Sequence, residues 1–353
     1  MRPGFLWLAG FRDLQWRRRR FVIAVLGSSL VFAITLLMTG FLSSFSLEID
    51  RTTEIVGAEG FIVPEGRPGP YTGTAPLAGE TVDEVRKLDG VKAAHAIVSA
   101  LQVTDRPYRP DVYLIGAEPN GFGSPKPSQG RVPRDAGEAV VDTSAHLDIG
   151  DEFTVGSVRF TVVGLTSGLT AIGFHPVVFV SLEDAQLALF GGISLVTAIG
   201  VEGAPTVVPP GLAYVDETAA RADLKRPLRD TMDSIKLFRS LMWIVATAIV
   251  GSVVYLSALE RLGDFAVFKA IGTSTSDLLA ALMFQAIVLS VSASVLAIGL
   301  ARLIAPLNAV SVQFPMRNQL ALPLAGLAIG ALASVVALRR AVTVDPALAF
   351  GGH

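Results

Sequence analysis

The chain has 353 residues, of which 51% are hydrophobic and only 17% are charged, and its mean hydropathy is +0.54. This composition is that of a membrane protein rather than an ordinary soluble one. The chain contains no cysteine, which excludes both a disulfide framework and thiolate chemistry.

The net charge of −2 hides an uneven distribution of charged residues along the chain. Residues 46–235 hold 26 of the 31 acids and 15 of the 29 bases, a net charge of −11. The remainder holds 5 acids and 14 bases, a net charge of +9. An acidic central block between basic, hydrophobic flanks indicates two compartments and argues against nucleic-acid binding.

The N-terminal region predicts an amphipathic helix followed by a membrane span. In residues 1–20, apolar side chains recur at helical steps, which is typical of a cytoplasmic helix lying on the membrane surface. A plain extension that orients the next segment is the alternative. Four arginines end this region: Arg17, Arg18, Arg19 and Arg20. They place the N-terminal end of the next segment in the cytoplasm.

Residues 21–45 carry no charge and are long enough to cross the hydrocarbon core of a bilayer. A secretory signal peptide is the rival interpretation. The apolar stretch is too long for one, and no clear cleavage site follows it. We therefore expect a retained first transmembrane helix.

Residues 46–235 are predicted to form an extracytoplasmic α+β domain that contains a small β-rich insertion. Short apolar runs between Pro- and Gly-rich turns predict strands at 60–64, 96–104, 112–116, 139–141, 153–155, 159–165, 177–180 and 196–201. Helices are expected at 80–88 and at 182–189, the second capped by Ser181. A charged stalk at 216–236, interrupted by Pro227, is expected to lead into the next membrane helix.

Three more transmembrane helices are expected after this domain. The predicted spans are 236–259, 276–304 and 320–338, with a cytoplasmic loop at 260–275, an external loop at 305–319 and a cytoplasmic tail at 339–353. Arg339 and Arg340 follow the last helix and, with the N-terminal arginines, place both termini in the cytoplasm. Gly326 and Gly330 form a G-x-x-x-G pattern, a weak signal for close helix packing.

The cytoplasmic loop contains the most informative stretch, ERLGDFAVFKAIGTSTSDLL at 260–279. Its apolar residues recur at three- and four-residue steps, which allows a small helix with one apolar face. Gly272 can close that helix, and Ser274 can start the next one. An ordinary interfacial turn is the alternative that the residues alone leave open.

The stretch resembles the cytoplasmic loop of the FtsX-like permease family, the MacB, LolC and DevC class of ABC transporter subunits. That loop reads E-R-x-x-E-I-G-x-L-K-A-I/L-G-A-S-x-x-D-I/L. This chain departs from it at Asp264, Phe265, Ala266, Phe268 and Thr273, which weakens details of the ATPase contact more than the resemblance itself. The stretches at 129–167 and 339–347 resemble the same family, so the resemblance covers essentially the whole chain.

The resemblance implies an α-helical membrane protein with four transmembrane helices and a MacB-like periplasmic core domain between the first two. It also implies that the loop is a coupling helix that docks on a separate cytoplasmic ABC ATPase. The residues it assigns to this contact are Glu260, Arg261, Asp264, Phe265, Phe268, Lys269, Ala270, Ile271 and Gly272.

The resemblance further implies a bacterial plasma-membrane complex of two ATPases with two permease copies. A homodimer is expected over a heterodimer, with ATP and Mg bound by the ATPases. Membrane lipid and an extracytoplasmic adaptor or cargo protein are the other expected partners.

No motif in the sequence indicates an enzymatic activity. The chain has no G-x-x-x-x-G-K-[ST] phosphate loop, so ATP binding is expected in the partner subunit. Its histidines are His95, His146, His175 and His353, which lack the spacing of metal ligands. No nucleophile with an oriented base can be named. We therefore expect no cofactor or metal in this chain, and no enzymatic activity of its own.

The expected function is that of a permease subunit that exports or extracts a hydrophobic or amphiphilic substrate, such as a lipid, lipoprotein, peptide, drug or haem. The cores of the four spans lack ionisable residues, which argues against a secondary transporter. One alternative is an FtsX-like mechanotransmitter that activates a cell-wall hydrolase, although the large external domain favours transport. A small-solute importer is the third interpretation, and the four helices and large external domain argue against it.

Overall fold

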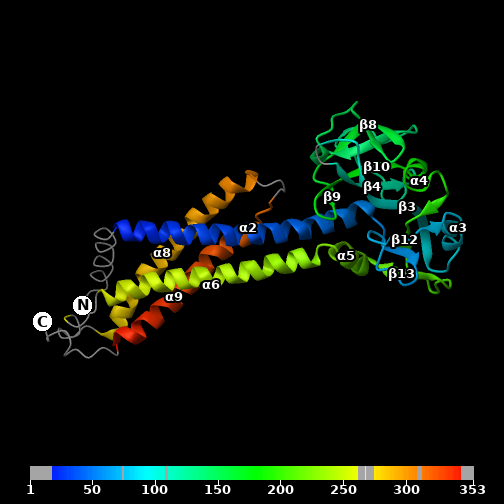
Figure 1. The fold of residues 1–353 in the computed structure, drawn as a ribbon. Coiled ribbons are helices and arrows are strands. Elements are labelled where there is room, and N and C mark those ends of the chain that lie inside the picture. Colours follow the sequence, from blue (N-terminus) through cyan, green and yellow to red (C-terminus); the bar gives the residue numbers. More distant parts are fainter. Residues whose placement is uncertain are drawn as a thin grey trace. The chain divides into compact units, whose positions relative to one another are not determined.

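The computed structural model describes residues 18–73, 75–107, 110–260, 267, 274–307 and 312–342. The chain divides into two compact units. Met1–Ser44 and Asp233–His353 belong to the first unit, and Phe45–Met232 forms the second. Figure 1 labels many of the elements of both units.

Within the described residues, the first unit is built from long helices. They are α2 (Arg18–Val56), whose last turns belong to the second unit, α6 (Arg229–Leu259), α8 (Thr275–Ile304) and α9 (Met316–Val342), with a short 3-10 turn, η2 (Ala305–Leu307). Four helices are long and apolar enough to cross a membrane, as the sequence predicts.

Three of these helices are several residues longer than expected. α9 (Met316–Val342) extends beyond the predicted span 320–338 at both ends, and α2 and α6 also exceed their predicted spans. The first was expected to end at residue 45, but α2 continues to Val56. The second was expected to begin at residue 236, but α6 begins at Arg229, directly after the interruption that Pro227 was expected to cause. Helix formation therefore extends beyond the apolar stretches that hydropathy identifies.

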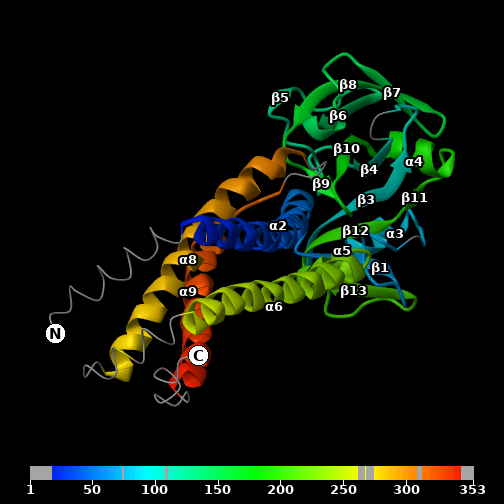
Figure 2. The ribbon, with the colours of Figure 1, turned by 60° about the vertical axis from the view of Figure 1, so that its left-hand side comes forward.

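α8 and α9 run antiparallel and lie side by side (Figures 1 and 2). Their close approach is made at the G-x-x-x-G pattern. A Cβ atom on Gly330 would lie 3.0 Å from the carbonyl oxygen of Ala286, and one on Gly326 would lie 2.8 Å from Ser294 Oγ. Small residues thus allow the two backbones to approach, which is how helices associate in a membrane.

The second unit is built on a mixed sheet of 11 strands in the order β13-β1-β12-β3-β4-β10-β6-β8-β5, with β7 paired to β8 and β9 to β10. Its strands are β1 (Gly60–Pro64), β3 (Val91–Val103), β4 (Asp111–Ala117), β5 (Gln129–Gly130), β6 (Glu138–Asp142), β7 (Glu152–Val155), β8 (Val158–Thr166), β9 (Thr170–Ala171), β10 (His175–Ser181), β12 (Ala198–Gly203) and β13 (Leu212–Asp216). A separate pair is formed by β2 (Leu77–Ala78) and β11 (Leu195–Val196). The helical elements of this unit, beside the end of α2, are α3 (Thr81–Val85), α4 (Leu182–Phe190), α5 (Glu217–Lys225) and the 3-10 turn η1 (Thr143–Ala145).

Most predicted strands are confirmed with small changes at their ends, and β1 has the predicted bounds. The strand predicted at 96–104 begins five residues earlier, because β3 spans Val91–Val103. The strand predicted at 196–201 is wrong as a single element, because Thr197 separates β11 from β12. The helix predicted at 80–88 is shorter. The cap of α4 is confirmed, since the Ser181 hydroxyl accepts a hydrogen bond of 3.0 Å from the Asp184 N–H.

Alternating side chains give the sheet two apolar faces. In β1, Ile62 belongs to one buried cluster, whereas Phe61 and Val63 belong to another. The first cluster includes residues of α3 and α4. The second includes Ile49 and Val56 of α2 and Ala220 and Leu224 of α5. The last turns of α2 therefore cover the sheet, which explains why this helix continues past residue 45.

Candidate functional site

The segment predicted to contact an ATPase lies almost entirely outside the described residues. Glu260 is exposed and follows α6, where its N–H donates to the carbonyl of Leu256 at 3.1 Å. α8 begins one residue after Ser274. The remaining predicted contact residues, Arg261, Asp264, Phe265, Phe268, Lys269, Ala270, Ile271 and Gly272, fall outside the described residues.

The basic residues predicted to orient the chain lie at helix ends. Arg18, Arg19 and Arg20 form the first turn of α2, and Arg19 is exposed. Arg17 lies outside the described residues. Arg339 and Arg340 lie near the end of α9.

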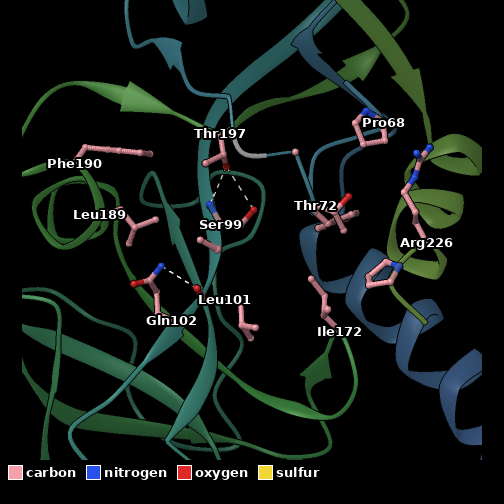
Figure 3. A pocket seen from close by; sticks show the side chains of 14 residues that line it. Pro68, Thr72, Ser99, Leu101, Gln102, Ile172, Leu189, Phe190, Thr197 and Arg226 are labelled. Carbon is pink, nitrogen blue, oxygen red and sulfur yellow. Dashed lines mark hydrogen bonds between the residues drawn. The ribbon is translucent and has the colours of Figure 1, made fainter. Parts of the chain in front are cut away.

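The second unit contains a pocket of about 700 Å³ that sequence reasoning did not identify. Its wall comes from six separate parts of the chain: residues 68 and 71–73, residues 99–102 of β3, Ile172, residues 189–190 of α4, Thr197, and Arg226 with Pro227. Figure 3 shows these side chains around the pocket. Because the wall is assembled from segments far apart in the chain, no local pattern could have revealed it.

The loop that carries Tyr71 and Thr72 is fixed to α5 by a buried carboxylate. Asp223 is 1% exposed. Its Oδ2 accepts hydrogen bonds from the N–H groups of Tyr71 at 2.9 Å and Thr72 at 3.1 Å, and the Thr72 hydroxyl donates to Oδ1. A Cβ atom on Gly69 would lie 2.5 Å from the Cβ of Asp223, so only glycine allows this approach. One wall of the pocket is thus held in place.

The opposite wall is the edge of β3 beyond its pairing with β12. That pairing ends at Ile97 opposite Ala198. Further along, the Ser99 N–H donates to Thr197 Oγ1 at 2.9 Å, and Gln102 Nε2 donates to the Leu101 carbonyl at 2.9 Å. Side chains therefore satisfy strand groups that a neighbouring strand would otherwise bind.

Burial changes the chemistry of the Tyr71 phenol, which belongs to the wall held by Asp223. The Tyr71 ring is 5% exposed and packs edge-on against Phe61, with ring centroids 5.6 Å apart. Burial raises the pKa of Tyr71 well above its ordinary value, because the phenolate would lose its hydration. The ring therefore stays neutral and serves as part of the core.

A turn between β9 and β10 connects the pocket to α2. Ile172, which lines the pocket, has φ of +52°, and Phe174 has φ of +69°. Such values are unfavourable for side chains of this kind, so surrounding contacts must hold the turn. Glu48 of α2 accepts a hydrogen bond of 2.7 Å from the Phe174 N–H, and the Thr52 hydroxyl donates to the Thr170 carbonyl at 3.0 Å.

The residues around His95 form an ion-pair cluster. His95 Nδ1 lies 2.8 Å from Glu118 Oε2, and Arg86 Nη2 donates to both Glu118 oxygens at 3.0 Å. In the described part of the chain, no group of three or more His, Asp or Glu side chains could hold a metal ion.

A family model described as the MacB-like periplasmic core domain matches residues 22–212. A second, described as the FtsX-like permease C-terminal, matches residues 237–346. Two uncharacterized ABC transporter permeases of Mycobacterium tuberculosis, Rv2563 and Rv0072, are each 41% identical over 345 residues. These matches cover 98% of this chain and 99% of each relative.

The matches define a membrane permease of the ABC transporter class, and this class implies a partner ATPase. The chain belongs to the family of ABC transporter permeases that join a MacB-like periplasmic core domain to an FtsX-like permease region. The family resemblance stated from the sequence is confirmed.

Two solved structures are similar to part of this chain. The extracellular domain of the noncanonic ABC-type transporter YknZ from Gram-positive bacteria is 16% identical, with a TM-score of 0.31, and covers 42% of this chain and 84% of its own length. The periplasmic region of MacB from Actinobacillus actinomycetemcomitans is 14% identical, with a TM-score of 0.36, and covers 48% of this chain and 95% of its own length.

Proposed function

We propose that this permease couples ATP hydrolysis by a separate cytoplasmic ATPase to movement of its external domain, and that it exports or extracts an amphiphilic substrate. The observation that carries the proposal is the continuity of α6. This helix runs unbroken from Arg229, at the end of the external domain, to Leu259, directly before the loop that resembles a coupling helix. A continuous helix can transmit a displacement along its axis because its backbone hydrogen bonds resist local bending.

The proposed ATPase contact is made by residues 260–272, with Phe265 and Phe268 as its apolar anchors. The sequence predicts a short helix here, and two aromatic side chains three residues apart on such a helix would suit a groove on a partner, because such anchors supply most of the binding energy in an interface. The working complex would contain two permease copies and two ATPases, with ATP and Mg on the ATPases. Both termini of each permease would lie in the cytoplasm.

The test replaces both aromatic anchors by a charged residue. The chain carrying Phe265→Asp and Phe268→Asp is co-expressed with its ATPase and purified in nanodiscs. We expect at least a tenfold loss of co-purifying ATPase, because each anchor should contribute more than about 1 kcal/mol. Membrane insertion should be unchanged, since the substitutions lie outside the four spans.

The matched control places the same charges on the external domain. Ile193 and Val207 are 63% and 73% exposed, so Ile193→Asp with Val207→Asp should leave ATPase binding intact. If the chain carrying Phe265→Asp and Phe268→Asp still forms a stable complex with a stimulated ATPase, at the level of this control, the coupling assignment is wrong.

A further inference from the structure

The pocket of the external domain carries a single charged side chain among its described lining residues. That residue is Arg226, and the described lining contains no carboxylate. No ion pair links Arg226 to another residue in the described ranges, whereas nearby Arg221 contacts both Asp50 and Glu217. Arg226 is also exposed. A solvated guanidinium at the rim of a pocket without carboxylates attracts an anionic group.

The rest of the lining is mainly apolar. Figure 3 shows Arg226 and Thr72 on one side of the pocket and Leu189 and Phe190 on the opposite side. Leu101 and Ile172 add further apolar surface. An exposed cation beside a mainly apolar lining complements a molecule with an anionic head and a hydrocarbon chain.

The pocket is formed before any ligand arrives. The head side is held by the hydrogen bonds of Asp223 to the Tyr71–Thr72 loop. The side that would hold the hydrocarbon chain is formed by β3, where the Ser99 N–H donates a hydrogen bond to Thr197 Oγ1. Its volume of about 700 Å³ lies within the range of roughly 300–1,000 Å³ typical of small-molecule sites. A preformed site loses little conformational entropy on binding.

We propose that this pocket binds an acyl amphiphile with an anionic head group. The head pairs with Arg226, and the acyl chain lies against Leu101, Leu189 and Phe190. Arg226 and Pro227 also join α5 to α6, so an occupied pocket would contact the joint that leads into the second membrane helix. The assignment of the pocket as a cargo site rests on the proposed function, whereas the proposal that it binds the amphiphile does not.

Photolabelling of the full chain in nanodiscs tests the proposal. The probe is a long-chain fatty acid with a diazirine in its chain, and the neutral probe is the alcohol of the same chain. After irradiation, mass spectrometry should find the acid on peptides that contain residues 99–102 and 189–190. The alcohol should label these peptides about tenfold less, because it lacks the charge that pairs with Arg226.

Three variants separate the pocket from general lipid contact. Arg226→Gln should reduce acid labelling about tenfold, to the level of the alcohol. Arg229→Gln removes an exposed arginine that does not line the pocket, so it should label like the unchanged chain. Leu101→Glu, at a side chain that is 45% exposed, should abolish labelling by the acid without disturbing the core.

A phospholipid with the same diazirine chain identifies the source of the ligand. If this phospholipid labels the pocket peptides, the ligand is a membrane lipid. If only the free acid labels them, the ligand is a released acyl acid. The proposal is overturned if the pocket peptides stay unlabelled, or if Arg226→Gln and Arg229→Gln label alike. Because no ATPase is present, this result is independent of the coupling test.

Discussion

Individual carboxylates fix the loops of the external domain. Asp142 is fully buried, and its two oxygens accept hydrogen bonds from the N–H groups of Ser144 at 3.0 Å and Leu169 at 2.8 Å. Glu138 likewise binds the Arg134 N–H at 2.9 Å, and Arg131 donates to it through both terminal nitrogens. The backbone N–H groups in these turns have no strand partner, and the carboxylates accept their hydrogen bonds instead.

The Arg131–Glu138 pair gives a prediction about pH. The hydrogen bonds from Arg131, with help from the N–H groups of Arg134 and Asp135, lower the pKa of Glu138 to about 2. A lowered pKa adds stability above the ordinary value of roughly 4.3, and this stability is lost as the pH falls toward 2. Arg131→Gln should therefore lower the melting temperature by a few degrees at pH 7 and have little effect near pH 2.

Thermal unfolding of the full chain in detergent, followed by circular dichroism at both pH values, checks this. Arg134→Gln removes a neighbouring exposed side chain but keeps the backbone N–H that binds Glu138, so it should unfold like the unchanged chain at each pH. An equal loss for Arg131→Gln at pH 7 and at pH 2 would contradict the assignment.

At the scale of elements, the contact of α8 with α9 depends on glycine. A Cβ atom on Gly330 would meet both the carbonyl oxygen and the carbonyl carbon of Ala286, at 3.0 and 3.1 Å. These are backbone atoms, so the helices must separate to admit a side chain. Gly330→Val should destabilise the membrane unit by roughly 1–3 kcal/mol, as overpacking does elsewhere.

The control for this prediction lies on the partner helix. A Cβ atom on Gly299 of α8 would meet nothing within 4 Å, so Gly299→Val should be close to neutral. The thermal stability of both valine variants in the same detergent provides the measurement. Equal melting temperatures would show that the close approach of α8 and α9 is not needed.

Patterning predicted those elements whose signal is local. The membrane spans follow from long apolar runs, and strands such as β1 follow from alternation between turns. The end of α2 was missed because charged residues follow Phe45, although Ile49 and Val56 still pack on the sheet. The two-residue strands were missed because they are too short to show a period.

The contacts between distant segments were not predictable in the same way. Arg131 and Glu138 both occur in the family pattern, yet nothing in their spacing indicates a salt bridge. The pocket needs Arg226 beside a loop that lies about 150 residues earlier in the chain. Such neighbours are set by the sheet order, which no single stretch of sequence encodes.

At the scale of the whole molecule, basic residues should set the orientation in the membrane. Replacing Arg17, Arg18, Arg19 and Arg20 by glutamine should lower the fraction of chains whose external domain lies outside by half or more, because charges beside the first span dominate insertion. The chain has no cysteine, so Val207→Cys gives a single label site that is 73% exposed.

Labelling of that cysteine by a membrane-impermeant maleimide in intact cells measures the orientation. Replacing the exposed Arg134 and Arg159 of the external domain by glutamine serves as the control and should leave labelling unchanged. Full labelling of the chain without its N-terminal arginines would show that other signals determine the topology.

The position of β1 in the sheet determines when the external domain can finish folding. β1 pairs with β12 and β13, with Phe61 opposite both Gly200 and Val215. Both neighbours are synthesised near the end of the domain. At the usual rate of about 5–20 residues per second, β1 waits on the order of ten seconds for them. Throughout that time the unpaired edges of β1 can pair with strands of other chains. The nascent chain is therefore most prone to aggregate before its second membrane helix has been synthesised.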